Sequence, residues 1–329
     1  MRVMRMGKRA PLLPGSLRAQ AGRPQSRAYL ALAIGILCIG MSAIWVKWAG
    51  VPGPVAGLYR VVTALVVLGL PCAARQRQAA AGPLGRRAVV LAALSGVWFA
   101  GDLATWSESV RHTSAANATL IGNLAPLWVA LGALLFWRLR LRAGFWAGLA
   151  LALAGGAIIV SADMDAGLSF GAGDGLAILS SLFYAAYLLN TEYSRRTLGT
   201  LAFMWLSALG STVVLIVTCA ALGLPATGFS TQTYLALLGM GLVSHVGGWL
   251  AINYALGHLP APLVSVTLLG QPVMTALLGV PLLGERLTLP QIGGGLIVLT
   301  GIYLANRAQR QVAPVANPDL LPGDADSAT

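Results

Sequence analysis

The sequence predicts an all-α integral membrane protein with ten transmembrane helices arranged as two inverted five-helix repeats. Three observations predict this fold: long apolar runs, a one-sided placement of Lys and Arg, and an internal repeat. Of the 329 residues, 57% are hydrophobic and only 10% are charged, whereas a soluble domain carries about 25% charged residues. The charged residues are therefore too few to cover a water-exposed surface.

The apolar runs are about 20 residues long, which is the length that crosses a bilayer as a helix. We expect a first repeat at residues 28–161 and a second at 173–307, between a disordered basic arm at 1–27 and a disordered tail at 308–329. Pro52, Pro54 and Pro290 are placed at helix starts, where a missing N–H costs least. The ten predicted spans are 28–48, 53–72, 88–107, 113–136, 143–161, 173–193, 199–222, 233–255, 261–283 and 290–307.

The basic residues gather on one side of the predicted spans. With the N-terminus in the cytoplasm, all of the 22 Lys and Arg residues lie in cytoplasmic segments except Lys47, Arg60, Arg111 and Arg286. This distribution follows the positive-inside rule and predicts that both termini are cytoplasmic, in an inner cell membrane. It also explains the net charge of +12 by topology and anionic lipid, and argues against nucleic-acid binding.

The chain aligns with itself at a constant offset of 146 residues, which pairs His112 with His258 and Pro126 with Pro272. Each half holds five spans, an odd number, so the second copy must be inverted relative to the first. Inverted repeats are typical of transporters that work by alternating access.

The second half carries a series of short motifs in a specific order, from His258-Leu259-Pro260-Ala261 through Gln271-Pro272 and Gly284-Glu285-Arg286-Leu287 to Gly293-Gly294 and Gly301. The first half echoes it at Thr113-Ser114-Ala115, Asn123-Leu124-Ala125-Pro126 and Gly148, and Tyr59-Arg60 and Gly173-Asp174 also fit. This pattern resembles the EamA-type branch of the drug/metabolite transporter superfamily over residues 28–307.

The resemblance implies ten helices and transport of small metabolites, mostly efflux, with amino acids as one example. It does not imply one particular substrate. The first half departs from the pattern, because Arg138-Leu139-Arg140 stands where the family often has Gly-Glu-Arg. Any role of that family glutamate can therefore be carried over only to Glu285.

Pro126 and Pro272 lie mid-way along the fourth and ninth spans. A proline inside a helix removes a backbone hydrogen bond and kinks the helix. Matched interruptions in two halves are the best sequence indication of a transporter's central site. The alternative is a kink that serves packing alone.

Polar and aromatic side chains share helix faces around these prolines and are expected to line a substrate cavity. The alternative is that they form hydrogen bonds between helices. The candidate residues are Ser42, Trp45, Arg60, Trp98, Trp106, Thr119, Asn123, Pro126, Tyr184, Tyr187, His245, Trp249, Asn253, Thr267, Gln271 and Pro272.

Asp102 and Arg60 are the charged residues that lie away from the ends of the predicted spans. Asp102 is a candidate for proton coupling, since a charged Asp near a membrane-helix centre costs about 2.5–3.5 kcal/mol and is usually functional. Its alternative is a protonated or hydrogen-bonded residue that ties helices together. Arg60 is expected about 10 Å inside the second span by helical rise, facing the cavity and holding an anionic group, with snorkelling outward as the alternative.

Two other function classes account for parts of the sequence. An intramembrane aspartyl protease is suggested by Gly171-Ala172-Gly173-Asp174, but Asp102 lies in no matching motif and Asp174 stands where a helix N-cap is expected. A non-transporting scaffold or sensor would not explain an inverted repeat. No nucleotide-binding or metalloprotease motif is present, and three cysteines suggest no metal site. We therefore expect no enzyme activity and no cofactor, with a small-molecule substrate and the lipid bilayer as partners and a homodimer left open.

Overall fold

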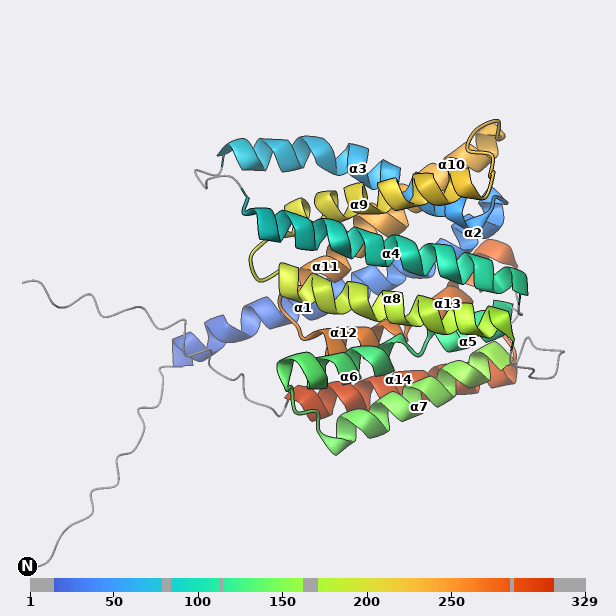
Figure 1. Cartoon of the computed structure of the whole chain (residues 1–329). Helices are drawn as coiled ribbons and strands as arrows, with labels where there is room; N and C mark the ends of the chain where they lie inside the picture. The colour runs from blue at the N-terminus through green and yellow to red at the C-terminus, as the bar shows by residue number, and fades with distance from the viewer. Residues whose placement is uncertain (1–14, 79–83, 113–114, 162–170, 285–286, 311–329) are drawn as a thin grey trace, which may run out of the picture.

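The computed structural model describes residues 15–78, 84–112, 115–161, 171–284 and 287–310, and every regular element in those ranges is a helix (Figure 1). Eight helical stretches are long and apolar enough to cross a membrane, and two shorter apolar helices, Ala125–Trp137 and Ala143–Ile159, complete the bundle. The predicted all-α membrane fold is thereby confirmed.

The first half contains α1 (Gly15–Gly40), α2 (Ser42–Ala49), α3 (Gly53–Gln78), α4 (Arg86–His112), α5 (Ala115–Gly122), α6 (Ala125–Trp137) and α7 (Ala143–Ser161). The second half contains α8 (Ala172–Ser194), α9 (Thr200–Ala221), α10 (Thr231–Gly239), the π-helix η1 (Met240–Trp249), α11 (Leu250–Leu256), α12 (Ala261–Leu268), α13 (Gln271–Leu283) and α14 (Leu289–Arg310).

The helix breaks at the two prolines coincide in the two halves. Helices α5 and α6, moved by 146 residues, fall on the bounds of α12 and α13. Pro126 and Pro272 each stand in the first turn after the break, where a missing N–H is tolerated. In each repeat, the proline therefore lies just after the end of one short helix and in the first turn of the next.

The two halves are inverted relative to each other, as α7 and α14 show directly. A Cβ on Gly148 would stand 2.6 Å from the Gly301 carbonyl oxygen, and a Cβ on Gly294 would stand 2.8 Å from that of Gly155. Gly148 corresponds to Gly294 and Gly155 to Gly301, so each contact is the image of the other. The helices are therefore antiparallel and packed about a pseudo-two-fold axis that crosses them, with glycines allowing the close approach.

Apolar side chains cover the outside of the bundle. Leu70 is 82% exposed and Phe136 is 72% exposed, and many Leu and Val side chains on other helices are also exposed. Lipid would cover these side chains, whereas water would make such a surface prone to association. The two ends of the bundle differ in charge, since α1 begins and α3, α6, α8 and α14 end on the side that carries most of the described arginines (Figure 1).

Three local features differ from the sequence prediction. Helix α1 begins at Gly15, inside the segment expected to be a disordered arm, and the first span is broken at Met41 rather than continuous. The eighth span contains the π-helix η1, which the hydropathy pattern did not indicate.

The predicted N-cap of the sixth span is wrong. Gly171 is the N-cap of α8, and Asp174 stands three residues later, where its Oδ2 accepts the Gly171 N–H at 2.8 Å. The carboxylate still lies in the first helical turn, so it stabilises the positive end of the helix dipole.

Candidate functional site

Arg60 lies inside the bundle and is held by the second half. Its side chain is 9% exposed. Its Nε donates a hydrogen bond to His245 Nδ1 at 3.2 Å, and its guanidinium carbon stands 5.6 Å from the centre of the Phe99 ring. Residues 60 and 245 are on α3 and η1, so this contact joins the two repeats. Arg60 therefore lies among side chains of both repeats.

Phe99 on α4 is the centre of an aromatic cluster. The rings of Tyr187, Trp249 and His245 lie 5.0, 5.0 and 5.5 Å from its own. Tyr184 extends the cluster, since its ring lies 6.1 Å from that of Trp249. The structure thus brings Arg60, Tyr184, Tyr187, His245 and Trp249 of the expected cavity into one place.

Asp102 lies one helical turn after Phe99 on α4. Its Oδ1 accepts the Ser180 hydroxyl of α8 at 2.6 Å. Among the described residues no ion pair within 4.0 Å joins Arg60 to Asp102. The site therefore holds a guanidinium group and a carboxyl group that form no direct ion pair.

Asn253 connects the cluster to α9 and to the basic end of the bundle. Its Oδ1 accepts the Tyr187 hydroxyl at 3.0 Å, and its Nδ2 contacts Met204 Sδ at 2.6 Å. Its backbone oxygen accepts Arg195 Nε at 3.0 Å. Arg195 stands just beyond the span, and its partial burial lowers the pKa of the guanidinium from the ordinary value. Asn253 is fully buried and fully engaged, so it supports the site rather than offering a free group.

Four buried polar groups of the expected cavity residues have no hydrogen-bond partner among the described residues. They are Ser42 Oγ, Trp45 Nε1, Asn123 Nδ2 and Trp249 Nε1. A buried donor without a partner is costly and rare in folded proteins, so such a group needs an explanation, such as a ligand. Trp249, at 4% exposure, is the member of this group that belongs to the aromatic cluster.

Other expected cavity residues lie elsewhere. Gln271 Nε2 donates to the Ile39 oxygen at 3.4 Å, and Thr275 Oγ1 donates to the Gly40 oxygen at 2.9 Å, where the first span is broken. Thr267 Oγ1 accepts Asn306 Nδ2 at 3.2 Å. These polar groups of the ninth span bond to neighbouring helices in this structure.

The remaining candidates lie around the breaks and at the rim. Trp98 stacks on Phe183 at 5.9 Å, and Trp106, 38% exposed, approaches the end of α5 at Gly122. Thr119 is half-buried on α5, and Pro126 and Pro272 are the starts of α6 and α13. Glu285 and Arg286 of the Gly-Glu-Arg motif lie outside the described residues.

Sequence reasoning missed Phe99 and Ser180. Phe99 is the repeat equivalent of His245, and that correspondence was a usable signal for it. Ser180 precedes Tyr184 by one turn on the face that carries Tyr184 and Tyr187, so an extension of that face toward its N-terminal end would have included it.

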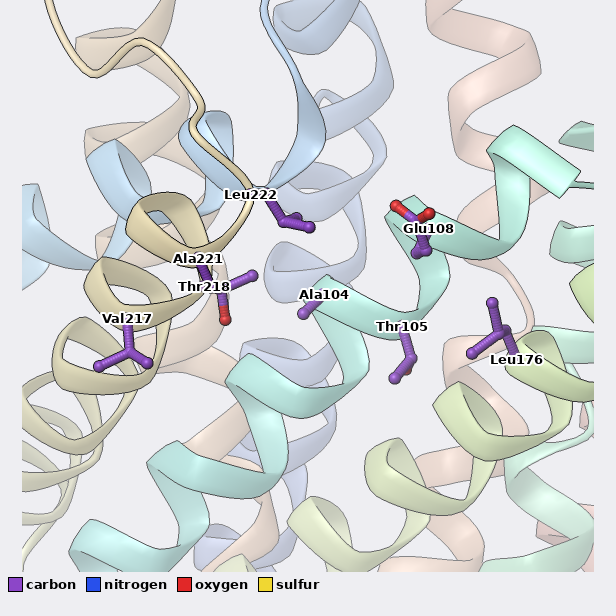
Figure 2. Close-up of a pocket in the computed structure, with 8 residues that line it drawn as sticks. All are labelled: Ala104, Thr105, Glu108, Leu176, Val217, Thr218, Ala221 and Leu222. Carbon is purple, nitrogen blue, oxygen red and sulfur yellow. The ribbon is translucent and has the colours of Figure 1, made fainter.

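A cleft of about 350 Å³ opens on the surface between α4, α8 and α9. Figure 2 shows Thr105 and Glu108 of α4 and Leu176 of α8 on one side and the end of α9 on the other. It contains none of the expected cavity residues. Its inner wall nonetheless lies close to the Asp102–Ser180 contact, since Thr105 and Leu176 are one turn from those two residues.

In the described part of the chain no three His, Cys, Asp or Glu residues come together as a metal site. The site can bind a ligand through hydrogen bonds, charge and aromatic contacts, and it lies between two inverted repeats.

Comparison with known proteins decides the family. The profile of the EamA-like transporter family matches residues 26–161 and again residues 171–307. This chain belongs to the EamA-like transporter family. It is a multi-pass membrane protein of a transporter family, and the two matches fall one on each repeat.

Two single proteins are also similar to this EamA chain. An uncharacterized transporter of Archaeoglobus fulgidus is 30% identical over 212 residues, which cover 62% of this chain and 71% of that protein. A solved structure described only as the crystal structure of a protein superposes with a TM-score of 0.74 at 19% identity, covering 88% of this chain and all of the other. The latter likeness concerns the fold alone.

Proposed function

We propose that this EamA protein is a secondary transporter that exports small metabolites, such as amino acids, across an inner cell membrane by alternating access. The observation that carries the proposal is the position of the aromatic cluster. Phe99 and His245 are equivalent residues of the two repeats and are in contact. A residue can meet its own equivalent only near the symmetry axis, so the cluster sits at the pivot between the halves.

Both halves contribute to this cluster. Arg60, Phe99 and Asp102 come from the first repeat, and Tyr184, Tyr187, His245 and Trp249 come from the second. If the repeats exchange conformations, a ligand held here is released from one side of the membrane and reached from the other. The broken helices α5–α6 and α12–α13 supply matched joints for this motion.

The protease alternative has less support. Asp174 is engaged with the start of its own helix and Asp102 with Ser180, so these two carboxyl groups have separate partners. Aspartyl proteases need two carboxyl groups that share a site. The family match also favours a carrier over an enzyme.

The test is flux in proteoliposomes that contain the purified full-length chain. Vesicles loaded with a metabolite mixture are diluted into buffer, and the external medium is analysed over time by mass spectrometry. Substrate-dependent efflux above empty vesicles supports a carrier, and acceleration by the same substrate on the opposite side supports alternating access. No flux for any metabolite of a broad panel in either direction would argue for a scaffold.

The orientation is tested separately. Reporter tags inserted after residues 80 and 200 are both expected in the cytoplasm, because these positions follow helices that end on the basic side. An exterior location of either tag contradicts the proposed topology without bearing on flux.

A further inference from the structure

Three side chains of the aromatic cluster, Arg60, His245 and Trp249, carry N–H groups for which the described part of the chain offers no acceptor. The first is the Arg60 guanidinium, which among the described residues donates a hydrogen bond only to His245, through Nε. Its two terminal nitrogens donate to no described residue. An arginine has five N–H donors and no acceptor, so most of its hydrogen-bonding capacity is unused here.

The second donor follows from the first. Because arginine can only donate, His245 must accept with a bare Nδ1, and a neutral imidazole then carries its proton on Nε2. The ring therefore presents Nε2–H on its other side. His245 is 5% exposed, and none of the described residues accepts from this nitrogen.

The third donor is the Trp249 indole. Its Nε1 is fully buried without a partner, while its ring is fixed by edge contacts with Phe99 and Tyr187. Packing thus positions the N–H and leaves it unused. An indole N–H can donate a hydrogen bond but cannot accept one. A ligand that pairs with Trp249 Nε1 must therefore supply an acceptor.

The nearby oxygen atoms bond elsewhere. Asp102 Oδ1 accepts the Ser180 hydroxyl at 2.6 Å, and the Tyr187 hydroxyl donates to Asn253 Oδ1 at 3.0 Å, so neither contact involves Arg60 or Trp249. The cluster contains unused N–H donors, one guanidinium group and the apolar ring of Phe99. Such a site is complementary to a ligand with an anionic oxygen group.

We propose that Arg60 and Trp249 form a subsite for the carboxylate of the transported molecule, with His245 holding the guanidinium through Nε, which gives the substrate class as small organic acids with an apolar body, zwitterions included. The inference rests on the proposed function. The aromatic cluster contacts the apolar body, and Asp102 lies where an ammonium group of a zwitterion would be attracted. One carboxylate neutralises the one arginine. A phosphate dianion would bring excess negative charge next to Asp102 inside the membrane, which is unfavourable.

The first experiment measures binding to the purified full-length chain by thermal stabilisation, with probes that share a phenyl body. The probes are 3-phenylpropionate, phenylalanine, phenylalaninamide, phenethylamine and phenyl phosphate. The two carboxylates are expected to stabilise the protein, and the amide, the amine and the phosphate are not. Equal stabilisation by the amide or the amine, or none by either carboxylate, overturns the subsite. Preference for phenyl phosphate identifies a different anion and overturns the carboxylate assignment.

The second experiment removes single donors. Trp249→Phe keeps an aromatic ring and removes the indole N–H together with the five-membered ring, and it is expected to weaken 3-phenylpropionate binding about ten-fold, the size of a hydrogen bond to a charged group. Arg60→Gln should abolish binding. The matched control is Trp146→Phe, since Trp146 packs on Phe145 in a separate part of the core. Unchanged affinity in Trp249→Phe contradicts the role of the indole, whether or not Arg60→Gln folds.

Measurements of metabolite efflux from vesicles distinguish failure of the carboxylate subsite from failure of the proposed transport function. Metabolite efflux that persists in wild-type vesicles without any preference for carboxylates leaves the carrier standing and removes the subsite. Absence of all flux removes the carrier instead.

Discussion

Phe99 and His245 stand at equivalent positions of the two repeats, and their rings lie 5.5 Å apart. The symmetry axis therefore passes beside them, yet the two residues differ in chemistry. Phe99 supplies an apolar face to the Arg60 guanidinium, and His245 supplies the acceptor for Arg60 Nε. The two residues are equivalent in repeat position and differ in what they offer to Arg60.

Replacing His245 by the residue of its repeat equivalent, Phe99, should destabilise the protein. His245→Phe removes the acceptor and leaves a buried guanidinium less satisfied, at a cost of about 1–3 kcal/mol. The measurement is thermal unfolding of the purified protein in detergent. His245→Asn, which can keep an acceptor oxygen near the guanidinium, should lose less. Equal stability of wild type and His245→Phe would show that the 3.2 Å contact contributes nothing.

The αL position after α6 offers a stabilising substitution. Arg138 has φ 51° and its repeat equivalent Gly284 has φ 69°. Only glycine takes this conformation without strain. Arg138→Gly is therefore expected to raise stability by about 0.5–1 kcal/mol, seen as a higher unfolding temperature. Arg140→Gly, outside that conformation, controls for loss of charge and should not stabilise. A fall in stability on Arg138→Gly contradicts this reading of the backbone.

The α7–α14 contact is tested by two neighbouring glycines. A Cβ on Gly294 would stand 2.8 Å from the Gly155 carbonyl oxygen, whereas one on Gly293 would meet no atom within 4 Å. Gly294→Ala should destabilise by about 1–3 kcal/mol, as overpacking does. Gly293→Ala should be neutral or gain up to about 1 kcal/mol in helix propensity. Similar unfolding temperatures for the two variants would mean that the repeats do not pack through this seam.

Proton coupling is tested at Asp102. In proteoliposomes an imposed pH gradient is expected to change the efflux rate of the wild type. Asp102→Asn, which cannot exchange a proton at this position but can still accept from Ser180, should transport without that response. Glu108→Gln at the rim is the control and should keep it. An unchanged response in Asp102→Asn assigns the residue to structure alone.

Much of the fold could be predicted because the bilayer imposes it. The thickness of the hydrocarbon sets the length of each span. The distribution of arginine sets the orientation of the spans, and the number of spans per repeat follows from counting them. The breaks near Asn123 and Leu269 could be placed because proline cannot continue a hydrogen-bonded turn. These signals are local in sequence, so they can be read without knowing the neighbours of each helix.

Other features depend on contacts between distant segments. The break at Met41 contains no proline, and the nearby carbonyls of Ile39 and Gly40 accept from Gln271 and Thr275, far along the chain. No pattern near Met41 reports those partners. The separation of Arg60 from Asp102, and the pairing of Asp102 with Ser180, likewise depend on how α3, α4 and α8 pack.

The π-helix η1 makes the two repeats unequal in one further respect. It spans Met240–Trp249, whereas the matching part of α4 is regular α-helix. In an ideal inverted repeat, swapping the two shapes would convert one open form into an equally stable form facing the other way. With a wide turn built into only one copy, those two forms contain different backbone hydrogen bonds and so differ in energy. An unloaded carrier of this kind would rest facing one side of the membrane.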